Sequence, residues 1–112
     1  MNTKYIPDRG DLVWLEFSPQ TGTEQKGKRP AYTLSPKSYN KKIGLAIFCP
    51  ITSKIKDYPF EVVVSDENKI SGAILVDHVK SLDWRARKAT FIQKTKKNIY
   101  DEVIGKLLTL LN

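Results

Sequence analysis

Short apolar runs broken by turn residues are the feature that most limits how this chain can fold. Six runs are strand-like, and each ends at glycine, proline or a polar cluster. A longer pattern comes last, where apolar residues recur at helical spacing from Ile99 to Leu111. The strand-like runs are residues 11–17, 31–35, 43–51, 60–65, 73–77 and 89–93. This order predicts a mainly β fold with α, a small and strongly bent β-barrel closed by a C-terminal helix.

The first strand-like run carries apolar side chains on both faces. Leu12 and Trp14 alternate with Val13 and Leu15, as expected for a strand whose two faces are both covered in a small barrel. Residues 43–51 are the most apolar run and are expected to form a central strand.

Two helical features are expected. Residues 36–42 are basic and predict a turn or a single helical turn. Asn98 with Asp101 resembles an imperfect capping box, which predicts that the C-terminal helix begins there. The apolar face of that helix is expected to consist of Ile99, Val103, Leu107, Leu110 and Leu111.

The length and the cysteine content limit the class of protein. A chain of 112 residues is expected to form one domain, residues 1–112, with a single ordinary core. Its one cysteine, Cys49, lies in an apolar run, so we expect a buried free thiol and a reducing, cytoplasmic setting. We expect no signal region and no membrane span, because no apolar run is long enough to cross a bilayer.

The charge is unevenly distributed. The formal net charge is +7, and residues 1–56 hold ten Lys and Arg against four Asp and Glu. A basic balance favours a polyanionic partner, either nucleic acid or an acidic protein segment.

The segment Gly22–Pro30 is the strongest candidate for a functional loop. It contains Glu24, Lys26, Lys28 and Arg29 and no apolar side chain before its proline. A polar loop between two strands is a usual place for chemistry, although a solvated hairpin loop has the same composition. Proline biases Arg29 toward an extended backbone, which would hold its guanidinium where the loop rejoins the sheet and allow it to grip a phosphate.

The remaining ionisable residues favour RNA chemistry without a metal. One histidine and one cysteine do not provide a zinc ligand set, and no cofactor-binding motif occurs. Glu24, Arg29, Thr52 and His78 are the candidates for RNA cleavage, in which a base takes the proton of the ribose 2′-hydroxyl, cations stabilise the charge on phosphorus and an acid protonates the leaving 5′-oxygen. Glu24 is the better base, Arg29 suits charge stabilisation, and Thr52 suits a positioning hydrogen bond.

Several segments, in this order and spacing, resemble the MazF/PemK (Kid) family of bacterial toxin endoribonucleases, most closely its chromosomal MazF branch. The resemblance covers nearly the whole chain. The segments that carry it are residues 10–14, 22–30, 34–36, 50–53, 58–60, 72–77 and 80–87.

The resemblance implies an SH3-like barrel of the CcdB/PemK type and a homodimer with RNA across its two-fold axis. It implies metal-independent cleavage of single-stranded RNA at a short motif, giving 2′,3′-cyclic phosphate and 5′-hydroxyl ends. The catalytic residues are expected to be Arg29, Thr52 and Glu24. The RNA-binding residues are expected to be Phe17, Lys26, Lys28, Ser53, Lys54, Lys56, Asp77 and His78.

Two positions depart from the family pattern. Leu75 stands where the PemK/Kid branch has a catalytic arginine, so that branch's assignment does not carry over whole. His78 stands where glutamine is common, and we assign it to base reading or a structural hydrogen bond, with a direct chemical role as the alternative. Its neighbour Asp77 is expected on a strand and therefore on the opposite face.

The implied protein partner is a MazE-type antitoxin with an acidic, disordered segment that competes with RNA for the basic surface. Two rival functions share the fold. A CcdB-like gyrase poison would be expected to end in Trp-Gly-Ile, whereas residues 110–112 are Leu-Leu-Asn. A non-catalytic RNA-binding barrel would bind RNA without cutting it.

Overall fold

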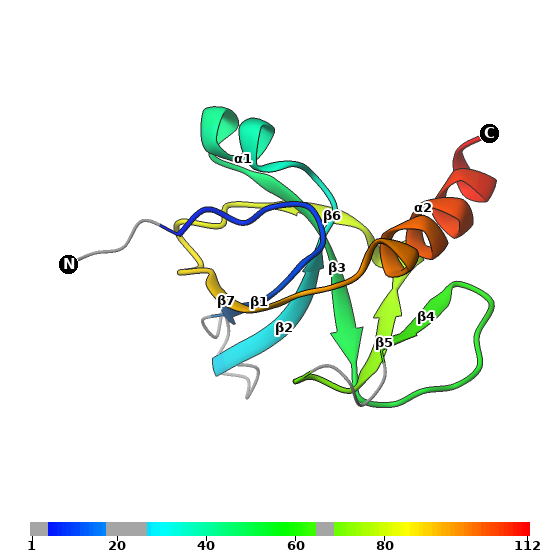
Figure 1. The fold of residues 1–112 in the computed structure, drawn as a ribbon. Helices are drawn as coiled ribbons and strands as arrows, with labels where there is room; N and C mark the ends of the chain where they lie inside the picture. Colours follow the sequence, from blue (N-terminus) through cyan, green and yellow to red (C-terminus); the bar gives the residue numbers. More distant parts are fainter. Residues whose placement is uncertain (1–4, 18–26, 65–68) are drawn as a thin grey trace.

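A bent antiparallel sheet carries two helices in the computed structural model, which describes residues 5–17, 27–64 and 69–112 (Figure 1). The elements in chain order are β1 (Asp11–Phe17), β2 (Gly27–Thr33), α1 (Lys37–Ile43), β3 (Ala46–Thr52), β4 (Glu61–Val64), β5 (Gly72–Leu75), the 3₁₀ turn η1 (Val76–His78), β6 (Lys80–Leu82), β7 (Thr90–Lys94) and α2 (Lys97–Leu111). The predicted mainly β fold with a C-terminal helix is confirmed, in the form of a curled half-barrel.

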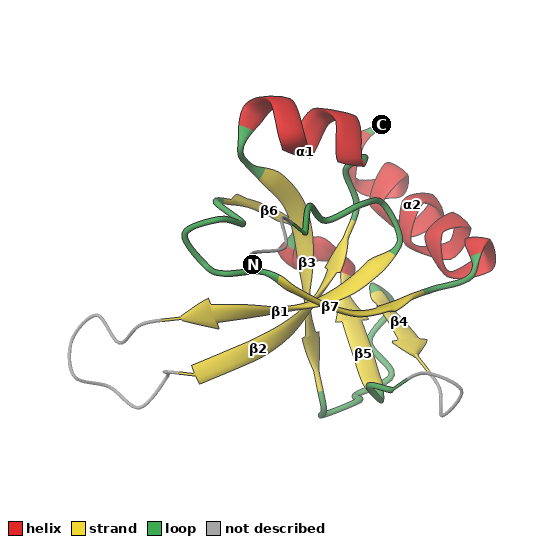
Figure 2. Cartoon of the chain, turned by 60° about the vertical axis from the view of Figure 1, so that its left-hand side comes forward, coloured by secondary structure: helices red, strands yellow, loops and turns green. Residues whose placement is uncertain are grey.

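The strands follow the order β4-β5-β3-β2-β1-β7, with β6 also paired to β3. One edge of β3 pairs with β2, while the other edge changes partner along its length. Its first residues pair with β6 and its last two, Ile51 and Thr52, pair with β5. This change of partner bends the sheet, and the end of β3 lies between β2 and β5 (Figure 2).

The two faces of the sheet pack into two separate hydrophobic clusters. In β1, Leu12 belongs to one cluster, while Val13 and Leu15 belong to the other. In β3 the same alternation sends Cys49 to the first cluster and Phe48 to the second. The prediction that both faces of the first strand are covered is therefore confirmed.

Helix α2 covers the first cluster through Val103, which is fully buried, with Ile99 and Leu107 packed beside it. Two parts of the helix prediction are wrong. Leu110 and Leu111 are exposed, because the last turn extends past the sheet. The helix begins at Lys97 with Lys96 as its N-cap and no side-chain cap hydrogen bond, so Asn98 lies inside the first turn.

Two further differences concern local structure. The basic segment after Pro36 is a helix of seven residues, α1, which ends at Gly44 in the left-handed conformation. The buried side chain of Asn40 in α1 donates hydrogen bonds to the carbonyl oxygens of Pro7 and Ser35, and these bonds stabilise a helix too short to persist alone. The fifth strand ends at Leu75, and Asp77 lies in η1. Among the described residues, neither helix has the length and apolar character to span a bilayer.

Candidate active site

Arg29 and Thr52 lie in one groove because of the register between β2 and β3. The ladder between β2 and β3 ends with Ala31 paired to Pro50, and Arg29 and Thr52 each lie two residues beyond that pair. Residues two apart on a strand project to the same face, and both side chains line the same groove. The groove has a volume of about 860 Å³ and is called here the Arg29–Thr52 groove. Its lining residues are Lys28, Arg29, Pro30, Pro50, Ile51, Thr52, Ser53, Lys69, Ile70, Ser71, Leu75 and His78.

The charges of this groove suit an anion. Lys28, Arg29 and Lys69 are its cationic lining residues, and the described residues that line it include no carboxylate. All three are exposed, so their attraction for a phosphate is screened by salt but acts over about a Debye length. Arg29 adds a planar fork of donors that matches two oxygens of one phosphate.

Thr52 is held by its own backbone neighbours. Its Oγ1 accepts a hydrogen bond from the backbone N–H of Lys54 at 3.1 Å. The hydroxyl proton of Thr52 therefore points away from the Lys54 nitrogen and can be donated to a ligand. On the far side of the strand Thr52 pairs with Ala73 of β5, next to Gly72.

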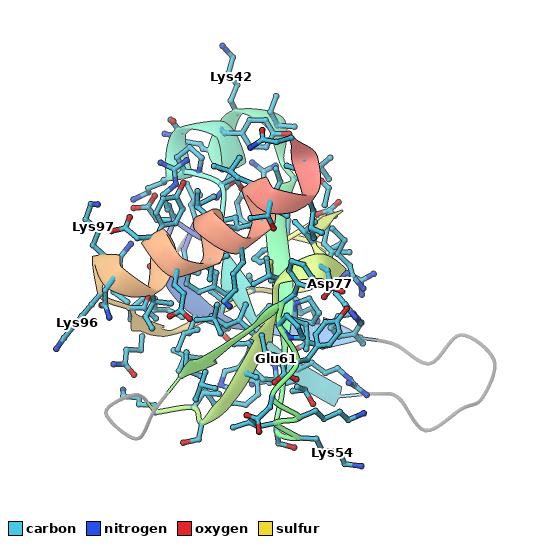
Figure 3. All side chains as sticks on the ribbon, turned by 90° about the vertical axis from the view of Figure 1, so that its right-hand side faces the viewer. Lys42, Lys54, Glu61, Asp77, Lys96 and Lys97 are labelled. Carbon is cyan, nitrogen blue, oxygen red and sulfur yellow. The ribbon has the colours of Figure 1, made fainter. Side chains whose placement is uncertain are left out.

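A second groove of about 520 Å³ adjoins the first and shares Thr52, Leu75 and His78 with it. We call it the Tyr58 groove; its other lining residues are Lys54, Lys56, Asp57, Tyr58, Pro59 and Glu61. Glu61 is a buried carboxylate that accepts the backbone N–H of Lys56 at 3.2 Å. This bond ties the segment after β3 to the start of β4, and Figure 3 shows Glu61 and Asp77 above Lys54 on this side of the molecule.

His78 and Asp77 are closer than expected from a strand. Because η1 turns the chain after β5, the Nε2 atom of His78 lies 3.9 Å from Oδ1 of Asp77, so the prediction of opposite faces is wrong. Tyr58 donates a hydrogen bond from Oη to Oδ2 of Asp77 at 2.8 Å. That bond raises the pKa of the Tyr58 phenol, since the neutral phenol is the donor to a carboxylate. His78 lines both grooves, whereas Asp77 is not among the described lining residues of either one.

A smaller apolar pocket of about 360 Å³ lies on the other side of Arg29. We call it the Phe17 pocket, and it is lined by Leu15, Phe17, Arg29, Pro30, Ala31, Phe48, Pro50, Ile51, Lys80 and Leu82. The guanidinium carbon of Arg87 lies 4.5 Å from the centre of the Phe17 ring. Phe17 is thus separated from Thr52, and Arg29 is the ionisable residue that both cavities share.

The structure brings together many of the residues expected from the sequence. Lys28, Arg29, Thr52, Ser53 and His78 line the first groove, and Lys54 and Lys56 line the second. Glu24 and Lys26 lie outside the described residues. Sequence reasoning missed three charged residues of these cavities, Lys69, Lys80 and Glu61, and also Arg87 beside the Phe17 ring. Lys69, Lys80 and Arg87 are far along the chain from Arg29 and Phe17, so no local pattern identifies them.

The described residues offer neither a metal site nor a reactive thiol. Within the described ranges no three His, Cys, Asp or Glu residues come together as a possible metal site. Cys49 is buried and free, as predicted. Burial raises its pKa to about 12, with the charge of Asp77 adding to the shift, so the thiol is neutral and unsuited to nucleophilic chemistry.

Comparison with known proteins defines the class. The family described as "PemK-like, MazF-like toxin of type II toxin-antitoxin system" matches residues 8–111. The chain therefore belongs to the PemK/MazF toxin family, as the sequence resemblance implied.

Individual relatives agree with this assignment. The chain is 51% identical over 90 residues, 80% of each sequence, to the endoribonuclease toxin MazF of Escherichia coli K12. It is 27% identical over 108 residues to the endoribonuclease PemK of Escherichia coli, covering 93% of this chain and 81% of PemK. The structure superimposes on MazF in a MazE–MazF crystal structure from Deinococcus radiodurans with a TM-score of 0.92, at 50% identity, over 96% of this chain and 97% of that one.

Proposed function

We propose that this MazF-family endoribonuclease cleaves single-stranded RNA at a short sequence motif in the Arg29–Thr52 groove. The observation that carries the proposal is that Arg29 and Thr52, each two residues beyond the last pair of the β2–β3 ladder, line one groove whose described lining residues include cations and no carboxylate. In this reaction the 2′-hydroxyl loses its proton to a base and the 2′-oxygen bonds to phosphorus, while the bond from phosphorus to the 5′-oxygen breaks and the 5′-oxygen takes up a proton from water. The products are a 2′,3′-cyclic phosphate and a 5′-hydroxyl, and the reaction uses no metal.

Each residue has a separate role in the proposed reaction. Glu24 removes the proton of the 2′-hydroxyl. Arg29 stabilises the added negative charge on the pentacoordinate phosphorus, a contribution typical of a preorganised cation. Thr52, whose oxygen already accepts the Lys54 N–H, donates its hydroxyl proton to a phosphate oxygen and positions it. DNA lacks the 2′-hydroxyl and is not cut.

The neighbouring cavities account for sequence selectivity. His78 lines both grooves and reads a base. The hydrogen bond from Tyr58 to Asp77 fixes the carboxylate that lies beside His78. The ring of Phe17 provides a stacking surface in its own pocket, because bases of single strands are commonly held on aromatic rings. Lys28, Ser53, Lys54 and Lys56 contact the phosphates on either side of the cut.

The same surface explains the proposed partner. The protein acts in the bacterial cytoplasm as a single-domain homodimer and is neutralised by a MazE-type antitoxin, the partner present in the structures from Deinococcus radiodurans. An acidic, disordered antitoxin segment is complementary to the cationic groove and competes with RNA there.

The test is cleavage of a long single-stranded RNA by purified protein in EDTA, with every new 5′ end mapped. We expect discrete cuts with 5′-hydroxyl ends. Arg29→Ala should lower the rate by about 10²–10³-fold, the loss expected for one charge-stabilising donor. Lys42→Ala, which removes an exposed cation outside the groove, is the control and should retain the wild-type rate. Intact cutting by Arg29→Ala would refute the assignment, and no cutting by the folded wild type would favour RNA binding or gyrase inhibition.

A further inference from the structure

A second cationic groove lies apart from the candidate active site. Its volume is about 780 Å³ and it shares no lining residue with the Arg29–Thr52 groove, the Tyr58 groove or the Phe17 pocket. We call it the Trp84 groove, and it is lined by Tyr5, Ile6, Lys41, Trp84, Arg85, Lys88, Ala89 and Thr90. These residues come from the N-terminal segment, from α1 and from the turn between β6 and β7.

Its charges are all of one sign. Lys41, Arg85 and Lys88 are exposed, and the described residues that line this groove include no carboxylate. None of the three forms an ion pair with any residue of the described ranges. Three cations around one concave surface, without an ion-pair partner in the described part of the chain, create a positive potential that an anionic ligand can neutralise.

Lys88 has a backbone conformation that lysine rarely adopts. Its φ is +49°, in the left-handed region that favours glycine. The turn that imposes it is closed by hydrogen bonds from the N–H of Lys88 to the carbonyl of Arg85 and from the N–H of Ala89 to that of Trp84, both 3.0 Å long. A lysine at such a position costs stability relative to glycine, and sites of this kind are often functional.

Arg85 presents a flat cationic surface. Its guanidinium carbon lies 5.0 Å from the centre of the Trp84 ring. Trp84 itself is only 6% exposed, and its Nε1–H donates to the carbonyl of Asn40 at 3.0 Å. The indole is therefore a fixed support, and the exposed face of the guanidinium can stack against a nucleobase while its N–H groups bind a phosphate.

The same turn also reaches the Phe17 pocket. Arg87 lies between Arg85 and Lys88 in sequence, and it covers the ring of Phe17. The N–H of Glu16 in β1 donates to the carbonyl of Arg87 at 2.8 Å, which joins the turn to the strand that carries Phe17. The turn that carries Arg85 and Lys88 of the Trp84 groove therefore also carries Arg87 to the Phe17 ring.

We propose that the Trp84 groove is an exosite for the sugar-phosphate backbone of single-stranded RNA, binding nucleotides outside the cleaved motif. The inference rests on the proposed function, because it assigns a second contact to the same RNA substrate. An acidic peptide is the less suitable ligand. Peptide segments that fold on binding gain affinity from apolar anchors, and the apolar side chains of this groove, Ile6, Trp84 and Ala89, are buried or half-buried.

The test compares one cleavage motif in two RNAs. The short RNA carries only a few flanking nucleotides, and the long RNA carries about 20 on each side, enough to pass beyond the groove at roughly 3.4 Å per nucleotide. The exosite variant is Lys41→Gln with Lys88→Gly. Glycine relieves the positive φ of residue 88, so the fold should be as stable as the wild type or more so by thermal unfolding. The control is Lys42→Gln with Lys97→Gln, which removes the same charge from residues outside the groove.

We expect the wild type to have a lower KM for the long RNA than for the short one. The exosite variant should lose most of that advantage and leave cleavage of the short RNA unchanged, whereas the control should keep it. The slope of log KM for the long RNA against log salt should become less steep by about 1.4, since each phosphate contact on a single strand contributes about 0.7.

An unchanged long-RNA advantage in the exosite variant would refute the proposal. So would a variant that binds long RNA normally and loses affinity for the antitoxin, or one that changes its oligomeric state, because the groove would then be a protein interface. Binding of long and short 2′-O-methyl RNA, which cannot be cleaved, separates the two proposals. If the wild type binds the long RNA more tightly than the short one and the variant does not, the exosite is supported even when the wild type cuts nothing. The absence of cutting would then count only against the proposed function.

Discussion

A β-carbon on Gly72 would lie 2.3 Å from the carbonyl oxygen of Thr52. Real β-carbons do not approach an oxygen so closely, so only glycine permits β5 to pair this tightly with the end of β3. The position of the Thr52 hydroxyl in the groove that it shares with Arg29 depends on this strand end. A residue without a side chain thus sets the position of a proposed catalytic group.

Gly72→Ala is predicted to disturb the site through the backbone. The added methyl group must push β3 and β5 apart, and overpacking of this kind costs about 1–3 kcal/mol of unfolding free energy. The cleavage rate should fall as well, because Thr52 moves with its carbonyl. Denaturant unfolding and a cleavage assay on the same sample measure both effects. Gly105→Ala is the control, since a β-carbon on Gly105 has no neighbour within 4 Å. Wild-type activity in Gly72→Ala would show that the strand end is not critical.

Tyr58→Phe is predicted to affect selectivity more than folding. The change removes the hydrogen bond to Oδ2 of Asp77, and Oδ1 of that carboxylate is already buried without a hydrogen-bond partner. Asp77 should then reorient and move His78. We expect kcat/KM to fall by roughly 10-fold, within the 10²-fold that a misplacement of about 1 Å can cause. Cleavage of a random RNA pool should show a changed preference among bases. An unchanged preference would show that Tyr58 has no part in base recognition.

Phe17→Leu is predicted to weaken RNA binding while retaining the apolar contact with its cluster. Loss of base stacking on an aromatic ring costs about 1–3 kcal/mol per base, so Kd should rise by roughly 5- to 150-fold. Phe17→Tyr keeps the ring and serves as the control. Equal affinity of the leucine and tyrosine variants for an uncleavable RNA would show that the ring only packs against Arg87.

Cys49 is predicted to make the protein less stable at alkaline pH. The folded thiol has a pKa of about 12 against 9.0 in the unfolded chain, so the stabilisation is complete below pH 9 and is lost as the pH rises toward 12. Between pH 8 and pH 10 this one group should lower the unfolding free energy by about 1.4 kcal/mol. Denaturant unfolding of the wild type and of Cys49→Ala at both values isolates the effect, because other groups contribute equally to both proteins. Parallel pH dependences would contradict it.

The amino-acid sequence by itself determined the elements that local periodicity controls. Alternating apolar residues in Asp11–Phe17 predicted a strand with both faces covered, and the spacing of Ile99 and Val103 predicted the C-terminal helix. The order of family segments predicted the endoribonuclease class and the pairing of Arg29 with Thr52 in function. These signals are local or carried by residue identity, so they need no knowledge of how distant segments meet.

Only the tertiary structure decided which charges share a cavity. Asp77 approaches His78 because the chain leaves β5 in a 3₁₀ turn, which the sequence periodicity did not show. Lys69 and Lys80 reach the cavities beside Arg29 from far along the chain, and Arg87 covers Phe17 across 70 residues of sequence. Such contacts arise from strand register and sheet curvature. Both are set by the packing of the whole sheet rather than by any one segment, so the Trp84 groove and its exosite could be inferred only from the folded protein.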